Sequence, residues 1–79
     1  MSRVTELAQE LVLATDVSAR DLAAKLKKPY STLMREVNPY DTGAKLGADT
    51  LLEMMAETGK TAPLEYMAAR LGFKLVRID

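Results

Sequence analysis

Cationic and hydroxyl side chains are concentrated in one stretch of the chain, where together they could bind a polyanion. Between positions 20 and 45 there are six basic and three acidic residues, a net charge of +3, although the 79-residue chain as a whole is neutral. The stretch contains Lys25, Lys27, Lys28, Ser31, Thr32 and Arg35. Lysine and arginine contact phosphates, and hydroxyl and guanidinium groups can also bond to base edges. The pattern therefore indicates a surface for an anionic partner.

The residue types on which most enzymes rely are missing. The chain has no histidine and no cysteine, which removes imidazole and thiolate chemistry, disulfides and the usual zinc ligands. Glu53 and Glu57 share a helical face, but like charges at this spacing are more typical of a solvated helix than of an acid–base pair. The glycine-containing loop at 41–49 lacks the spacing of a phosphate-binding loop. We therefore expect no enzyme activity, no cofactor, no metal and no small-molecule substrate.

Apolar periodicity and capping residues predict a bundle of about five helices and hence an all-α fold. The first covers about residues 3–14, and the second follows Ser18, a good N-cap with Asp21 at the capping-box position. The third begins near Pro29 and ends by Asn38, because a proline follows. The fourth is capped by Asp49 or Thr50 and ends at Gly59, and the fifth runs from Pro63 to Gly72. The methionines at helical spacing are expected to fill the core: Met34, Met54, Met55 and Met67.

The C-terminal segment 73–79, FKLVRID, lacks turn residues and is rich in residues that favour strands. A short strand there would have nowhere to pair within a helical chain, so it would need a second subunit. We expect one domain over residues 1–79, with 73–79 as a candidate oligomerisation segment in a homodimer or homotetramer. Tyr66 and Phe73 could lie in the core or in that interface. No apolar run approaches the length of about 20 residues that crosses a bilayer, so we expect no membrane contact and a location in the bacterial cytoplasm.

The third helix has two distinct faces. With about 100° of rotation per residue, one face carries Tyr30, Leu33, Met34 and Val37, and the other carries Lys28, Ser31, Thr32 and Arg35. The first face is apolar and predicts packing on the preceding helices. The second predicts contact with DNA, in the manner of a helix that enters the major groove while its neighbour spans the backbone.

Two stretches carry resemblances to known families. Ser18–Pro39, SARDLAAKLKKPYSTLMREVNP, resembles the helix-turn-helix of the Cro and repressor class. Lys28–Gly59, KPYSTLMREVNPYDTGAKLGADTLLEMMAETG, resembles more closely the small CII-type regulatory proteins of temperate phages and prophages. The resemblance implies a sequence-specific transcriptional regulator of phage developmental choice that binds double-stranded DNA as a dimer or larger homo-oligomer.

The chain departs from the repressor-class pattern in two places. Lys27 stands at the turn position that glycine usually occupies, where φ is positive and a side chain costs up to about 1 kcal/mol. The class usually buries the third residue after the Leu33 equivalent, which here is Glu36, whereas the apolar residue is Val37. Registering the helix on its own periodicity turns Tyr30 towards the core, whereas the class template turns it towards the bases.

These considerations define the expected site. We expect base contacts from Ser31, Thr32, Arg35 and Tyr30, and phosphate contacts from Lys25, Lys27 and Lys28. Each residue has a simpler alternative: a solvated lysine cluster, hydroxyls that favour a helix start, an arginine paired with a neighbour, or a packing tyrosine. Tyr40 and Asp41 are expected to stabilise the following loop through its backbone groups. The alternative function is a helical protein–protein interaction module that has lost DNA binding. The zero net charge and the presence of Lys27 in place of the usual turn glycine are both compatible with it.

Overall fold

Five helices account for most of residues 2–78, the part of the chain that the computed structural model describes. They are α1 (Arg3–Ala14), α2 (Ala19–Lys25), α3 (Tyr30–Glu36), α4 (Ala48–Thr58) and α5 (Ala62–Leu71). The all-α fold with about five helices is therefore confirmed. Met1 and Asp79, the ends of the predicted ranges 1–79 and 73–79, lie outside the described residues.

Local capping signals determine where several of these helices start and stop. The Ser18 hydroxyl accepts a hydrogen bond from the Asp21 N–H at 3.1 Å, as its place before α2 predicts. Gly59 and Gly72 end α4 and α5 in the left-handed conformation, with φ of 71° and 84°. This conformation strains residues with a Cβ, so glycine is favoured at both ends.

Two details differ from the sequence-based prediction. The fourth helix begins at Ala48 after Gly47, rather than after Asp49 or Thr50, because the extended Gly47 already directs its carbonyl to the Leu51 N–H at 3.0 Å. Asp49 lies in the first turn instead, where its carboxylate interacts favourably with the helix dipole. The predicted C-terminal strand is not formed within the described residues: 73–78 follow α5 without a strand assignment.

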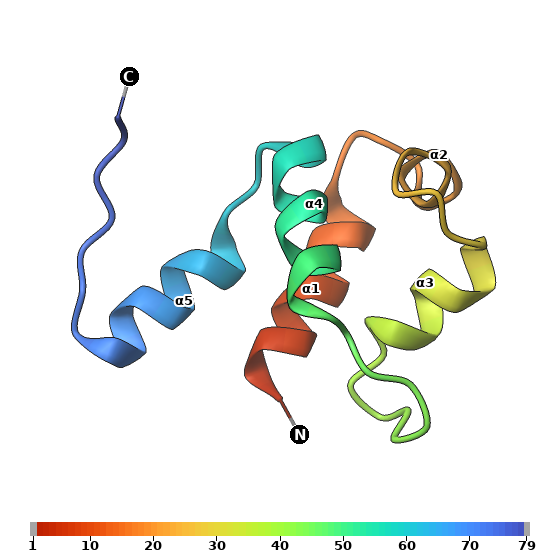
Figure 1. Cartoon of the computed structure of the whole chain (residues 1–79), viewed down its shortest axis with the longest axis horizontal. Coiled ribbons are helices and arrows are strands. Elements are labelled where there is room, and N and C mark those ends of the chain that lie inside the picture. The colour runs from red at the N-terminus through yellow and green to blue at the C-terminus, as the bar shows by residue number, and fades with distance from the viewer. Residues whose placement is uncertain (1, 79) are drawn as a thin grey trace.

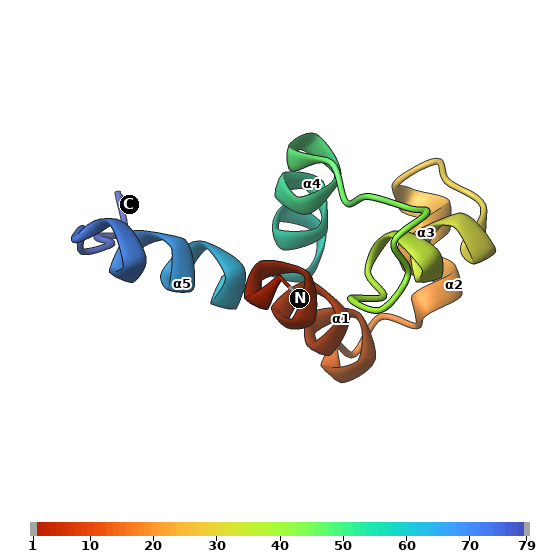
Figure 2. The ribbon, with the colours of Figure 1, turned by 90° about the horizontal axis from the view of Figure 1, so that it is seen from below.

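The core lies where α1, α2, α3 and α4 meet. In the ribbon, α2 and α3 lie to one side of α1 and α4, and α5 lies to the other (Figures 1 and 2). The α2 helix packs on α1, α3 and α4, so it connects α3 to α1 and α4. The buried cluster consists of Ala8, Leu11 and Val12 of α1, Leu22 and Ala23 of α2, Leu33 and Val37 at α3, and Leu51, Met54 and Met55 of α4.

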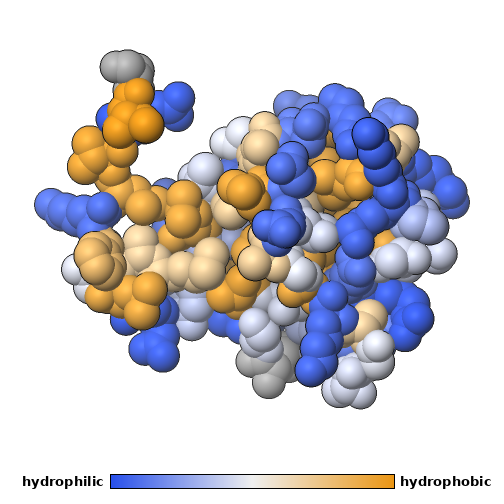
Figure 3. Space-filling model, viewed as in Figure 1, coloured by the Kyte–Doolittle hydropathy of each residue, from blue (hydrophilic) through white to orange (hydrophobic). Residues whose placement is uncertain are grey.

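The fifth helix contributes less to this core. It packs on α1, with Pro63 buried and Met67 partly buried against the cluster. The segment that follows turns back beside α5 and carries apolar side chains on its surface (Figures 1 and 3). Phe73 is 70% exposed, Val76 82% and Ile78 98%. The side of the molecule that bears α5 is therefore the more apolar in this view, and the side that bears α2 and α3 the more polar (Figure 3).

Candidate nucleic-acid interface

The outer face of α3 is open to solvent, while its inner face is buried. Leu33 and Val37 have no exposed surface, whereas Ser31 is exposed and 61% of the Arg35 side chain is accessible. Thr32 is half-buried. The burial of Val37 agrees with the register deduced from the helix's own periodicity. Ser31 and Arg35, four residues apart, therefore share an accessible face.

Tyr30 lies at the edge between these two faces. It is 37% exposed, so it belongs fully neither to the core nor to the outer face. The guanidinium carbon of Arg20, in the first turn of α2, lies 4.2 Å from the centroid of the Tyr30 ring. A cation at this distance from an aromatic face is attracted to it and links the starts of the two helices.

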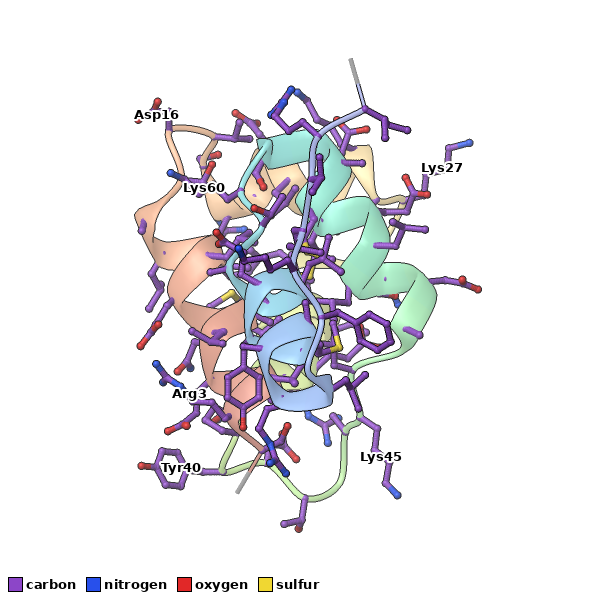
Figure 4. The ribbon with its side chains drawn as sticks, turned by 90° about the vertical axis from the view of Figure 1, so that its left-hand side faces the viewer. Arg3, Asp16, Lys27, Tyr40, Lys45 and Lys60 are labelled. Atoms are coloured by element: carbon purple, nitrogen blue, oxygen red, sulfur yellow. The ribbon has the colours of Figure 1, made fainter. Side chains whose placement is uncertain are left out.

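The turn between α2 and α3 places Lys27 in a strained backbone conformation. Its φ is +58°, and no other non-glycine residue among those described has a positive φ. The Lys27 and Lys28 N–H groups donate to the carbonyls of Ala24 and Ala23 at 3.1 and 3.0 Å, which closes the C-terminal end of α2. The Lys27 side chain is exposed and points away from the body (Figure 4).

The other two lysines of the predicted phosphate-binding set have acidic neighbours. The Lys25 amino group lies 4.0 Å from a carboxylate oxygen of Glu57, across from α2 to α4. The Lys28 amino group lies 3.2 Å from Glu36 Oε1 and donates a hydrogen bond to Oε2 at 3.3 Å. Neither pair is apparent from the sequence. Lys25 and Glu57 are far apart along the chain, and Lys28 precedes α3 whereas Glu36 is its last residue.

Arg35 also has an acidic partner, in the loop that follows α3. Its Nε donates to Asp41 Oδ2 at 2.9 Å, and Asp41 Oδ1 accepts from the Gly43 N–H at 2.9 Å. The hydrogen bond from Arg35, followed by that from the Gly43 backbone, lowers the pKa of Asp41 below its ordinary value. The same hydrogen bond and the negative charge of Asp41 raise the pKa of Arg35. The expected role of Asp41 in the loop is consistent with its bond to Gly43.

Arg20 and Asp41 are the partners that the sequence-based site omitted. Arg20 is ten positions before Tyr30, and only the crossing of α2 and α3 brings them together. Asp41 carried a detectable signal: a carboxylate six positions after an arginine, just past the proline that ends the helix. Tyr40, by contrast, is 76% exposed and points away from the body (Figure 4), while its N–H donates to Asn38 Oδ1 at 3.0 Å.

Other kinds of site find little support in the described part of the chain. No group of three or more potential metal-ligating side chains comes together within residues 2–78. Among the same residues, no helix combines the length and the apolar character needed to traverse a bilayer. The outer face of α3, its flanking turn and the loop at 38–47 therefore form the strongest candidate surface.

Comparison with known proteins agrees with the resemblance found in the sequence. The family model described as phage regulatory protein CII (CP76) matches residues 2–79. No curated protein and no solved structure gave a significant match.

Proposed function

We propose that this chain, which belongs to the phage regulatory protein CII family, regulates phage or prophage developmental choice as a sequence-specific DNA-binding transcription factor. The observation that carries the proposal is the outer face of α3, where Ser31 and Arg35 are accessible while Leu33 and Val37 hold the opposite face in the core. A helix that is fixed on one side and polar on the other is suited to the major groove.

The dimensions of α3 support this mode of binding. With its side chains, a helix such as α3 is about 10–12 Å in diameter, and the major groove of B-DNA is about 12 Å wide. In this proposal Arg35 donates to a guanine edge, and Ser31, Thr32 and Tyr30 supply further hydroxyl contacts. Lys25 ends α2, and Lys27 and Lys28 lie in the turn before α3; in this proposal all three contact phosphates, which sets affinity rather than base preference.

We further propose that the protein acts as a homodimer or homotetramer. The segment after α5 exposes several apolar side chains, and a cavity of about 390 Å³ between it and α5 is lined in part by Leu64, Leu75 and Val76. Exposed apolar surface of this kind favours association, and two copies would let two α3 helices reach successive turns of one duplex. Sedimentation of the full chain and of a chain lacking 73–79 tests this. A monomer at micromolar concentration in both cases would remove the oligomer proposal.

The ion pairs at the site favour one alternative, a helical interaction module without DNA binding. Glu57, Glu36 and Asp41 each lie beside a cation that would otherwise face the duplex. The two functions differ in their response to salt. DNA binding should weaken steeply as salt rises, because counterions are released on binding, whereas an apolar protein interface should depend on salt much less.

A selection from a pool of random duplexes at low salt tests the DNA-binding function. The expected result is enrichment of one sequence motif, with Arg35→Ala relaxing the preference at one base pair. Arg3→Ala is the matched control, since Arg3 is also an accessible arginine in ion pairs, 3.7 Å from both Glu6 and Glu10, but lies on α1. If no duplex binds better than bulk competitor DNA, the interaction-module function replaces the one proposed.

A further inference from the structure

The loop after α3 holds one carboxylate by both of its oxygens. Asn38 accepts from the Tyr40 N–H through its side chain and from the Asp41 N–H through its carbonyl, at 3.0 and 3.1 Å. These bonds turn the chain back beside the end of α3. Asp41 Oδ1 is then fixed by the Gly43 N–H, so that Oδ2 faces Arg35.

The bond from Arg35 Nε determines which edge of the guanidinium remains available. Arginine has five N–H donors in a planar fork, and it can bind a guanine through two of them. Here Nε–H is used by Asp41 Oδ2, which leaves the end of the fork that carries the two terminal nitrogens. A long side chain that is already held in one orientation loses less conformational freedom on binding.

Gly43 leaves room for this arrangement. A Cβ at position 43 would lie 3.2 Å from Arg35 Nη2 and 3.4 Å from Asp41 Oδ1. The first distance is tighter than ordinary contact, so a side chain there would displace the guanidinium or the loop. Gly47, in the same loop, offers a contrast, because a Cβ there would approach only the Thr50 hydroxyl, at 4.0 Å.

We propose that Asp41 is a positioning residue that sets base specificity: it orients Arg35 for end-on contact with guanine, and Gly43 provides the space that this orientation requires. The inference rests on the proposed DNA-binding function and adds to it a loop residue outside the recognition helix. Its electrostatic consequence is also specific. The carboxylate neutralises the cation locally, so Arg35 gains selectivity for a base rather than general affinity for phosphates.

The test compares binding preferences of the full chain and its variants by the same duplex selection. Asp41→Ala is expected to lower discrimination by about ten-fold at the base pair that Arg35→Ala affects, and the double variant should lose little more than either alone. Asp41→Asn keeps one acceptor oxygen and should retain more discrimination than Asp41→Ala. Circular dichroism of each variant checks that its helix content is unchanged.

A second pair of variants tests the positioning of Arg35 without changing Asp41. Gly43→Ala should shift the preference at that same base pair, whereas Gly47→Ala should leave it unchanged. The positioning role is overturned if Asp41→Ala weakens all duplexes equally with the preference intact, or if it tightens specific binding. It is also overturned if the effects of Asp41→Ala and Arg35→Ala simply add. If the unmodified chain itself enriches no motif, the proposed function fails and this role fails with it; enrichment followed by an unchanged Asp41→Ala preference rejects only the role.

Discussion

The amino group of Lys28 lies 3.2 Å from Glu36 Oε1, so a side chain from the turn before α3 is paired with the last residue of that helix. Only 27% of the Lys28 side chain is accessible, and only 17% of that of Glu36. If Lys28 were an unpaired phosphate contact, Lys28→Ala would mainly flatten the salt dependence of DNA binding. With this pair in place, we expect Lys27→Ala to reduce the slope by about one phosphate contact, and Lys28→Ala to reduce it less. Titrations between about 50 and 200 mM salt measure both slopes.

Glu36→Gln supplies the reverse change. It removes the charge that holds the Lys28 amino group, so the salt slope should become steeper than in the unmodified chain. Equal slopes for the Lys27→Ala and Lys28→Ala variants would show that the internal pair opens on DNA and has no influence on phosphate binding.

Lys27→Gly is expected to stabilise the fold and weaken DNA binding at the same time. The left-handed backbone at Lys27, with φ of +58°, strains a residue with a Cβ but not glycine. We expect the free energy of unfolding to rise by up to about 1 kcal/mol, because relief of strain exceeds the added chain entropy. Urea unfolding followed by circular dichroism measures this change, and a DNA titration measures the lost contact.

Gly59→Ala and Gly72→Ala are the matched controls, because they make the opposite change at φ of 71° and 84°. Nothing lies within 4 Å of a Cβ at either position, so any loss comes from the backbone alone. Each should lower the free energy of unfolding by about 1 kcal/mol. If Lys27→Gly instead lowers the free energy of unfolding, the lysine side chain stabilises the turn by more than the positive φ destabilises it.

Local signals in the sequence were sufficient for much of the fold. Ser18, Gly59 and Gly72 mark helix ends by their own side-chain and backbone chemistry, and the structure uses all three as predicted. The orientation of α3 could also be predicted, because the periodicity places Val37 rather than Glu36 on the buried face. The positive φ at Lys27 followed from its place in the turn.

Contacts that depend on how helices cross could not be predicted from local sequence signals. The stacking of Arg20 on Tyr30 requires the relative placement of α2 and α3, and the approach of Lys25 to Glu57 requires that of α2 and α4. The strand predicted for 73–79 shows a different limit. Its residue types favour extended chain, but a strand also needs a partner for its backbone hydrogen bonds.

Leu33→Ala tests how firmly α3 is held. Leu33 is fully buried and lies in the same cluster as Leu22 and Met54, so its truncation leaves a cavity and should cost about 2–5 kcal/mol. A chain of this length has a total stability of only about 4–12 kcal/mol. Leu13→Ala is the control, since Leu13 is 69% exposed on α1 and should change stability by no more than about 0.5 kcal/mol. Urea unfolding compares the two, and equal effects would contradict the assigned core.

The Arg35–Asp41 pair should make part of the fold's stability depend on acidity. The pKa of Asp41 is lowered in the folded chain, chiefly by its hydrogen bond from Arg35, so the unfolded chain binds the proton more tightly. The stability that this carboxylate contributes is therefore fully present above the unfolded pKa, about 3.9, and is lost as pH falls through the lower folded pKa. The raised pKa of Arg35 adds no dependence in this range, because arginine stays charged in both states.

Comparison with Asp41→Asn isolates this contribution from those of the other carboxylates. The difference in free energy of unfolding between the original chain and the variant should be constant from about pH 7 down to pH 5, and should shrink below about pH 4. Arg35→Met removes the main cause of the lowered pKa, so in that background the same difference should depend on pH much less. A difference that persists undiminished at about pH 2.5, where the unfolded carboxyl is protonated, would show that the oxygens of Asp41 stabilise the loop without the charge. In that case the charge pairing with Arg35 would not be the interaction that keeps the loop beside α3.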